Sequence, residues 1–471
     1  MFNKIFRFTQ EKSKYLYENS LILQNIDILI FISIAGVFLT STFLSSDVIG
    51  FVALITVLLT LIKLLTKPDE KLDYCSFELW LLAYFMIVIV SLAGSTLFTL
   101  SLKGFFKTFI YLMFYLSTVQ YLKINRDKIP HILGIIGLCI SFEAVVGFMQ
   151  NFAHVSEIST WQDISNLNPE QVMTRVYGTL KPLNPNLLGG YFVAGIPALY
   201  GLAAYFLVNK KEYIPTDMNK TVMLNLFQHL NFDKLFAKLP FVRFRNNFGM
   251  MTMLIFAILS TITLFLTGCR GSYIGMLVII TGILGISAKY LWQNFKILYL
   301  SVLCTIIVFI TSAILFVSSL RARVLSIFAM RQDSSNSFRF NVYQSSVEMI
   351  KDNWLLGIGV GNKNFREIYG LYMRTGFDAL STYNIFLEIA VESGIFALIA
   401  FVGFLVTLIK NAIKFILHSD EPKSVILVST ALISICAVCV HGFVDTVFFR
   451  PQIQFIFWTM VATIRSYIKV I

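Results

Sequence analysis

Long apolar runs recur along the chain, and short polar segments separate them. Most of these runs approach the ~20 residues that an α-helix needs to cross a hydrocarbon core of ~30 Å. Because every backbone amide in lipid must be bonded within the protein, the runs predict membrane-spanning helices. We predict about twelve, over residues 26–44, 48–65, 77–95, 104–122, 130–152, 187–208, 248–267, 271–288, 297–317, 383–408, 424–441 and 452–470.

The composition supports this interpretation. Apolar residues make up 57% of the chain, charged residues only 14%, and the mean hydropathy is +0.75. These values exclude an ordinary soluble domain, so the expected fold class is an all-α polytopic membrane protein. The polar N-terminus does not have the pattern of a secretory signal, and we expect the first helix to remain as an anchor.

Basic residues predict the orientation of the helices. With both termini in the cytoplasm, the connections on that side carry most of the 38 Lys and Arg residues, as the positive-inside rule requires. Residues 1–25 are then a cytoplasmic segment, and residues 26–470 form the transmembrane domain. Since this distribution accounts for most of the net charge of +12, we do not expect the chain to bind nucleic acid.

Three predicted connections are long. Residues 153–186 and 318–382 lie on the outer side, and the basic segment 209–247 on the inner side is interpreted as an insertion without an assigned function. The segment 318–382 is rich in aromatic residues and Leu, and we expect it to form a folded helical lid between the ninth and tenth helices. Two stretches in it have helical spacing, from Phe338 to Ile350 and from Asn364 to Met373.

A glycine-rich stretch, "GIGVGNKNF", follows the first of these lid helices. Its glycines, Gly357, Gly359 and Gly361, allow two interpretations. Backbone amides in such a loop can bind phosphate before a helix start, or the loop can form a plain turn.

Uncommon polar residues gather at the predicted outer face. They are Arg175, Arg270, Arg339, His441 and Asp445, together with Asn384, Glu388 and Glu392 on one helix. Residues four apart share a helix face, so the last three are expected to face one cavity and not lipid. Three guanidinium groups indicate an anionic ligand, because they are always charged and bind oxyanions bidentately.

Structural interpretations of the same residues stay open. The arginines can anchor helix ends or remain solvated, the glutamates can be protonated or ion-paired, and His441 can be an interfacial histidine. Glu143 in the fifth helix is expected to be an internal hydrogen-bonding partner. No Lys or Arg lies near the centre of a predicted span, which favours a site at the outer face over a path for anions through the membrane.

Six cysteines occur in the chain, at positions 75, 139, 269, 304, 436 and 439. The C-x-x-C pair, Cys436 and Cys439, lies in a predicted helix without a second ligand pair. We interpret the cysteines as small buried hydrophobic residues and predict no metal site and no cofactor.

Four segments carry a resemblance to a known family. They are "RVYGTLKPLNPNLLGGY" (175–191), "TGCRGSYIG" (267–275), "SFRFNVYQSSVEMIKDNWLLGIGVGNKNF" (337–365) and "YNIFLEIAVESGIFAL" (383–398). In this order and spacing they resemble the O-antigen ligase and polymerase superfamily, with a core of about residues 130–410. Two stretches, "FDALSTYNIFLEIAVESG" and "HGFVDTVFFRPQ", look closest to its IctB-type branch, which is associated with inorganic-carbon (bicarbonate) transport.

The resemblance implies a reaction and a location. Such ligases transfer a glycan from a polyprenyl diphosphate carrier to an acceptor hydroxyl, at the outer face of the bacterial inner membrane, without metal or nucleotide. Arginines neutralise the diphosphate leaving group and a base deprotonates the acceptor. On this basis the substrate-binding candidates are Arg175, Arg270, Arg339, Asn186, Asn384 and Asp445.

The predicted base departs from the family pattern. Where the ligases carry a His-Asn pair, this chain has Tyr383 and Asn384. A phenol with a pKa near 10 is a poor base at neutral pH, so transfer would need a substitute. Glu388 and His441 are the candidates for that role, beside Tyr383 itself.

Three functions therefore remain open. The chain is a membrane glycan transferase or a descendant that binds a lipid-linked polyanion, a transporter or transport accessory for a small anion such as bicarbonate, or a non-catalytic scaffold of envelope assembly. The expected partners are membrane lipid, a lipid-linked glycan or small anion, and envelope-assembly proteins.

Overall fold

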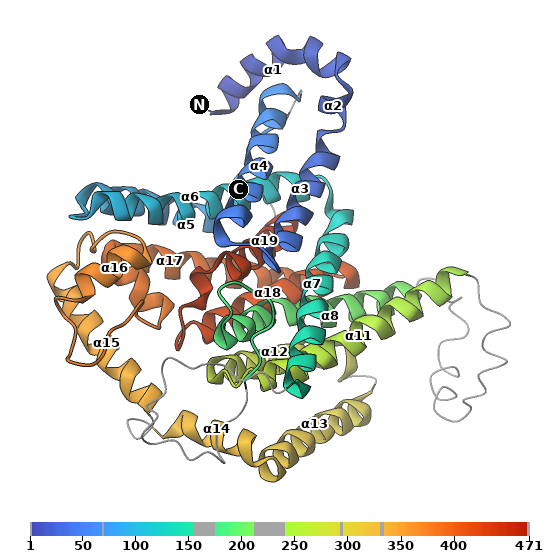
Figure 1. Ribbon diagram of the computed structural model, residues 1–471. Coiled ribbons are helices and arrows are strands. Elements are labelled where there is room, and N and C mark those ends of the chain that lie inside the picture. The colour runs from blue at the N-terminus through green and yellow to red at the C-terminus, as the bar shows by residue number, and fades with distance from the viewer. Residues whose placement is uncertain are drawn as a thin grey trace.

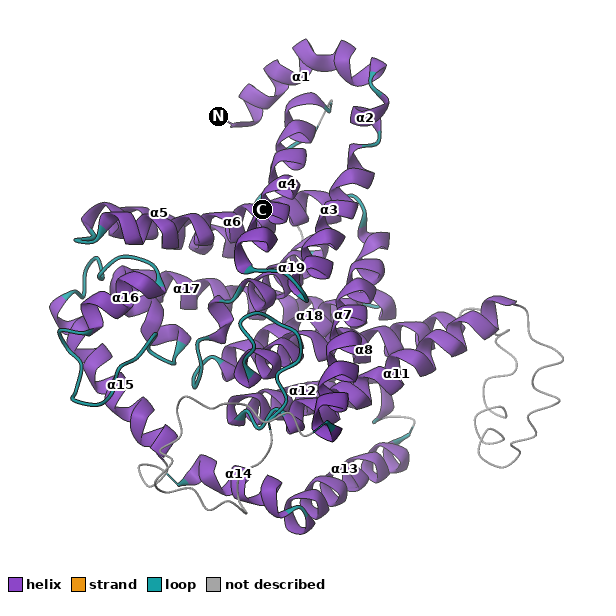
Figure 2. Cartoon of the chain, viewed as in Figure 1, coloured by secondary structure: helices purple, strands orange, loops and turns teal. Residues whose placement is uncertain are grey.

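The computed structural model describes residues 2–67, 70–153, 175–211, 241–292, 295–329 and 334–468. Within these ranges the regular structure consists of α-helices and two short 3-10 helices, with no strand (Figure 2). The prediction of an all-α fold is therefore confirmed. The predicted outer loop 153–186 and the basic segment 209–247 fall largely outside the described residues.

Nine helices of the described part are long and apolar enough to cross a membrane. They are α4 (Ser46–Thr66), α5 (Ser76–Gly94), the combined Arg126–Phe152 segment (η1, Arg126–Lys128, with α7, Ile129–Phe152), α8 (Pro185–Lys211), α11 (Phe241–Leu266), α12 (Arg270–Leu291), α13 (Lys296–Phe316), α17 (Ile385–His418) and α18 (Pro422–His441). Each coincides with a predicted span. The chain is a multi-pass membrane protein.

The other three predicted spans are also helices, but they are shorter or more polar. They are α3 (Ile26–Ser41, 16 residues), α6 (Phe98–Leu122, 25 residues) and α19 (Pro451–Tyr467, 17 residues). Two lysines, Lys103 and Lys107, lie in the first half of α6. The total of twelve spans therefore stays a prediction.

Helix α19 lies at the centre of the bundle, where α18 and α8 pack against it (Figure 1). Every residue from Pro451 to Ser466 is buried, and a helix buried on all faces belongs to the interior of a bundle. Both α18 and α19 begin with a proline, whose missing N–H is not needed in the first turn. The N-terminal α1 (Phe2–Asn19) and α2 (Leu21–Gln24) stand apart from this core.

The segment between α13 and α17 forms the helical lid that the sequence predicts. It contains α14 (Ser318–Phe328), α15 (Ser334–Asp352) and α16 (Asn362–Tyr369), which lie along one side of the molecule in Figure 1. The lid has a small core of its own, formed by Val342, Met349, Ile358, Phe365, Tyr369 and Ala379, with Val391 of α17. We call the end of the bundle that carries these helices the lid end.

The glycine-rich turn attaches the lid to α17. The φ angles of Gly357, Gly359 and Gly361 are +69°, +98° and +118°, and a Cβ on Gly357 would lie 2.4 Å from the backbone of Glu392. The amide of Gly359 donates to the Glu392 carbonyl at 2.9 Å, and the neighbouring Ile358 amide donates to Val391 at 2.9 Å. Since these amides are bonded within the protein, the plain-turn interpretation is confirmed.

Buried ion pairs lie at the opposite end of the bundle. Lys63 is fully buried and pairs with Asp27 at 2.8 Å and with Glu70 at 3.5 Å. Arg465 of α19 pairs with Glu78 of α5 at 2.8 Å. In the predicted topology, these helix ends lie on the same side of the membrane. The ion pairs between them agree with that topology.

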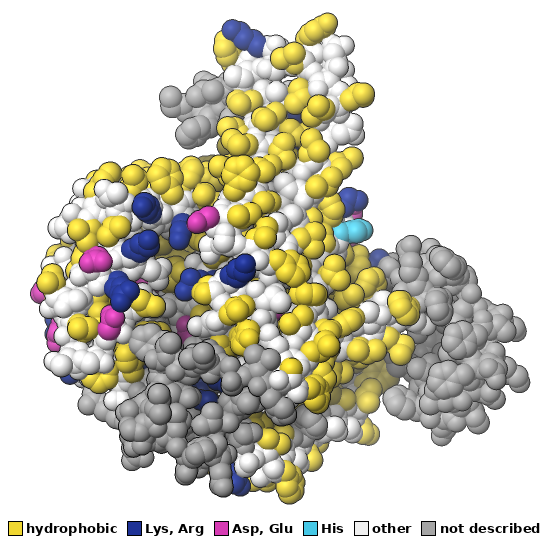
Figure 3. Space-filling model, viewed as in Figure 1, with side chains coloured by type: hydrophobic (Ala, Val, Ile, Leu, Met, Phe, Trp, Pro, Cys, Tyr) yellow, Lys and Arg dark blue, Asp and Glu magenta, His cyan; other side chains and the backbone are white. Residues whose placement is uncertain are grey.

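The surface agrees with a membrane environment. Hydrophobic side chains cover much of the visible face, whereas Lys and Arg gather mainly over the lid (Figure 3). Many large apolar residues on the long helices are exposed, for example Phe51 of α4 (63%) and Val308 of α13 (63%). Such apolar exposure along spanning helices is what contact with lipid requires.

Candidate functional site

A tight turn between α11 and α12 organises the predicted arginines. Gly268 in this turn has φ +61°, a conformation that favours glycine. Arg175 donates from Nε to the carbonyl of Thr267 at 2.9 Å and from its terminal nitrogen to Oδ1 of Asn186 at 2.6 Å. A Cβ on Gly268 would lie 3.3 Å from the Arg175 side chain, so the glycine also makes room for this arginine.

Arg270 begins α12 on the other side of the same turn. Its guanidinium donates to the carbonyl of Ser326 at 3.2 Å and to the hydroxyl of Ser326 at 3.1 Å. Asn336 of α15 donates to that same carbonyl at 3.0 Å. Arg270 therefore connects the membrane bundle to the lid at the point where α14 and α15 meet.

Arg339 lies one helical turn after Asn336 on α15, and residues three apart share a helix face. It donates to the Ser335 hydroxyl at 2.9 Å. Its Nε is buried and has no partner among the described residues. The three predicted arginines therefore lie at the lid end. Two of them, Arg175 and Arg270, lie at the turn between α11 and α12.

The start of α17 has an unusual backbone. Tyr383 is the one non-glycine residue with positive φ, +54°, in the part of the chain that the structure describes. Asn384 caps the helix, because its Oδ1 accepts from the amides of Phe386 and Leu387 at 2.9 and 3.1 Å. Its side-chain nitrogen donates to Phe443 at 3.1 Å, so its contacts in the structure are those of a helix cap.

The Tyr383 ring lies under the lid. It packs edge-on against Phe338 of α15 with centroids 5.7 Å apart, and Tyr343 donates its hydroxyl to the Tyr383 carbonyl at 3.2 Å. Burial and, to a lesser extent, the negative charge of Asp445 raise the pKa of Tyr383 against the opposing positive charge of Arg339, and the resulting pKa is about 12. The phenol therefore stays protonated at neutral pH and is a hydrogen-bond donor, not a base.

The two predicted carboxylates of α17 are buried, with Glu388 1% and Glu392 6% exposed. Glu392 accepts from the amide of Gly361 at 2.7 Å and so holds the glycine-rich turn. Glu388 accepts from the amide of Thr382 at 2.6 Å through Oε2. Its Oε1 is buried and has no partner among the described residues.

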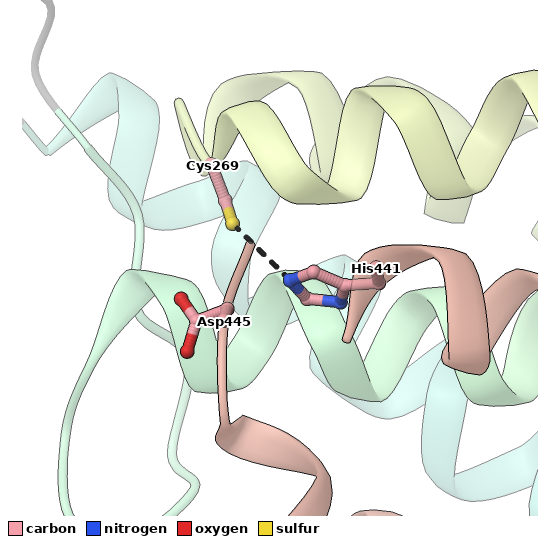
Figure 4. A group of neighbouring side chains, drawn as sticks. All are labelled: Cys269, His441 and Asp445. Carbon is pink, nitrogen blue, oxygen red and sulfur yellow. Dashed lines mark hydrogen bonds between the residues drawn. The ribbon is translucent and has the colours of Figure 1, made fainter. Parts of the chain in front are cut away.

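A second group of side chains lies beside this segment. Cys269, His441 and Asp445 are 4%, 2% and 5% exposed, and one ligand atom from each lies within 4.8 Å of the other two. Figure 4 shows the Cys269 sulfur directed at the His441 ring, at 3.8 Å from Nε2. We call these three residues the Cys–His–Asp cluster.

Two glycines allow the imidazole to enter the helix packing. A Cβ on Gly271 of α12 would lie 2.5 Å from the His441 ring, and a Cβ on Gly190 of α8 would lie 3.1 Å from it. A recess too narrow to hold a water molecule borders His441 and Asp445. The cluster is thus part of the packed interior at the lid end.

Cys269 is the residue that sequence reasoning missed. Burial raises the pKa of its thiol, but the hydrogen bond and positive charge of His441 outweigh burial and lower this pKa to about 7, against an ordinary value of 9. One feature of the sequence could have identified Cys269. It directly precedes Arg270, in a turn already selected from the sequence for its arginine. Its partner is 172 residues away, and the sequence gives no sign of that contact.

Glu143 has the role that the sequence predicts. It accepts from the backbone amide of Thr179 at 2.9 Å and from the hydroxyl of the same residue. Thr179 also donates to the carbonyl of Thr42 at 2.9 Å. Glu143 therefore attaches the segment after Arg175 to the bundle and is an internal hydrogen-bonding partner.

The fold and the site together define a class of protein. A bundle of apolar helices carries a helical lid, Arg270 joins the bundle to that lid through Ser326, and two buried carboxylates lie in the first turns of α17. This is a multi-pass membrane protein with a candidate anion site at one end of its bundle.

Residues 255–402 match the family model described as O-antigen ligase. This part of the chain is therefore similar to the O-antigen ligase family, in agreement with the resemblance seen in the sequence. The match includes Arg270, Arg339, Tyr383 and Glu388, together with the whole lid. No curated protein matches the chain.

Proposed function

We propose that the protein transfers a glycan from a lipid diphosphate carrier to an acceptor hydroxyl at the outer face of the inner membrane. The observation that carries this proposal is the placement of Arg175 and Arg270 on one tight turn, with Arg270 bonded to the lid that carries Arg339. The O-antigen ligase match over residues 255–402 supports the reaction class. The glycan and the acceptor are not part of the proposal.

The arginines neutralise the charge that develops on the diphosphate as the bond to the sugar breaks. A guanidinium carries five N–H donors, so Arg270 can hold Ser326 of the lid and also bind an oxyanion. Arg339 contributes a buried Nε without a partner among the described residues. Fixed positive charges at a leaving group act most strongly where water is excluded.

Glu388 is the base in this proposal. The acceptor oxygen attacks the anomeric carbon, its proton passes to Oε1 of Glu388, and the bond between that carbon and the diphosphate oxygen breaks. Tyr383 remains a phenol because its pKa is about 12, so it can donate a hydrogen bond to the sugar or the leaving group. His441 is not assigned this role, because its Nε2 faces Cys269.

The test uses purified protein in lipid vesicles with a polyprenyl diphosphate-linked glycan and a hydroxyl acceptor. Wild type should form product, and Arg270→Ala should lower the rate by about a hundredfold, which is typical of losing one charge-stabilising donor. Arg270→Lys should recover only part of the rate, since a lysine cannot bind an oxyanion bidentately. Arg366→Ala is the matched control, because Arg366 is an exposed lid arginine that pairs with Asp378 at 3.1 Å.

Three results would contradict the proposed function. Equal rates for Arg270→Ala and wild type would rule out the arginine role. If no donor and acceptor pair gives product while the same vesicles take up labelled bicarbonate, the anion-transporter alternative replaces this proposal. Co-purification with envelope-assembly proteins without turnover or uptake would instead favour a scaffold.

A further inference from the structure

We propose that the Cys–His–Asp cluster is a binding site for a divalent transition metal, with Zn²⁺ as the best-fitting ion. The three side chains come from separate elements. Cys269 precedes α12, His441 ends α18, and Asp445 lies in the turn before η6 (Val447–Phe449). This inference is independent of the proposed function, since the site does not use the arginines or Glu388.

The donor set fits zinc. Thiolate sulfur, imidazole nitrogen and carboxylate oxygen are the three ligand types that Zn²⁺ takes from proteins. Bond lengths of ~2.3 Å to sulfur and ~2.1 Å to nitrogen in a tetrahedral site place the two ligand atoms roughly 3.6 Å apart. The observed separation of Cys269 Sγ and His441 Nε2 is 3.8 Å, so a shared ion needs only a small adjustment.

Asp445 provides an independent observation. Its Oδ2 is buried and has no partner among the described residues, although the residue is only 5% exposed. Its Oδ1 accepts from the amide of Val447 at 3.2 Å, which fixes the carboxylate relative to the turn. Burying an unpaired carboxylate oxygen is unfavourable, and a bound cation removes that cost.

The charge balance of the three ligands also fits a divalent ion. One thiolate and one carboxylate neutralise a divalent ion, and a neutral imidazole completes three protein ligands. A metal here would join the start of α12 to the end of α18, directly behind the turn that carries Arg270.

The experiment measures metal binding without any glycan. Full-length protein is purified in detergent, treated with chelator, and titrated with Zn²⁺ and separately with Co²⁺. We expect about one Zn²⁺ per chain and, with Co²⁺, a near-ultraviolet charge-transfer band that reports a cobalt–thiolate bond. Cys269→Ser should abolish the band, and Asp445→Asn should weaken zinc affinity at least tenfold.

Cys439→Ser is the matched control, since Cys439 lies on α18 two residues before His441. It should keep both the stoichiometry and the band. Thermal unfolding without metal identifies variants that fail to fold, and His441→Gln provides a second ligand variant for that case. Equal zinc binding by wild type and Cys269→Ser, or no binding by wild type, would overturn the proposal, whatever the result of the transfer assay.

Discussion

Arg175 and Arg270 lie at the two sides of one tight turn, Arg175 bonded to the carbonyl of Thr267 and Arg270 placed as the first residue of α12. The first arginine comes from a segment near α8 and the second from the membrane helix that follows the turn. The turn therefore sets the spacing between two positive charges at the lid end.

The first prediction concerns this turn. Gly268→Ala introduces a side chain at φ +61° and 3.3 Å from Arg175, so it should destabilise the protein by about 1–2 kcal/mol and displace Arg175. Gly285→Ala is the control, because Gly285 lies within α12 and a Cβ there meets nothing within 4 Å. Thermal unfolding in detergent and binding of a soluble diphosphate measure the two effects. Unchanged values for Gly268→Ala would contradict this account of the turn.

A second prediction tests the carboxylates of α17. Glu388→Gln should lose transfer by about a hundredfold or more while binding of the lipid diphosphate donor is retained, because an amide cannot take the acceptor proton. Glu392→Gln should keep most of the transfer rate, since its amide oxygen can still accept from Gly361. Rates and donor affinities of both variants are compared at one pH. A transfer defect that is larger in Glu392→Gln than in Glu388→Gln would reverse the two roles.

A third prediction concerns alkaline pH. The pKa of Tyr383 is raised from 10 to about 12 in the folded protein, so the folded state holds this proton more tightly than the unfolded chain does. The resulting stabilisation is complete below about pH 10 and is lost as the pH rises towards 12. Tyr383→Phe should therefore lose less stability than wild type between pH 10 and 12, measured by chemical unfolding. Parallel curves for the two proteins would show that the phenol is solvated.

The fourth prediction tests the buried ion pair between Glu78 and Arg465. Their side chains are 8% and 3% exposed, and Tyr115 also donates to Glu78 at 2.7 Å. Glu78→Ala leaves a buried guanidinium without its partner and should cost about 3–5 kcal/mol. Glu18→Ala is the comparison, because Glu18 belongs to an exposed pair with Lys14 and its loss should leave the unfolding temperature unchanged. A small effect at Glu78 would mean that water reaches this site.

The sequence predicted the helices well because apolar length is a local property. The lid helix through Val342 and Met349 followed from spacing alone, and residues predicted to share one side of the membrane do contact each other. The Cys–His–Asp cluster could not be predicted, because it depends on how closely α12 and α18 approach. Gly190 and Gly271 permit that approach, because neither carries a Cβ that would collide with the His441 ring. This role of the two glycines can be recognised only in the packed structure.

Site roles were harder to predict than site positions. Glu388 and Glu392 have the same chemistry and lie one turn apart, yet one keeps an unpartnered oxygen among the described residues and the other holds a loop. Asn384 was singled out as a polar residue on an apolar helix, and the structure uses it as a cap. Hydrogen-bond partners contributed by distant backbone make these distinctions, and no local pattern encodes them.

The attachment of the glycine-rich turn has a consequence for biosynthesis. Ser91 of α5 bonds to the carbonyl of Glu392, 301 residues later, and Ser95 bonds to Ile358 at a separation of 263 residues. During translation, the hairpin of α5 and α6 is made long before its lid partners leave the ribosome. That early hairpin must wait in the bilayer with its polar end unmatched until the lid and α17 are made, so this contact forms late in synthesis.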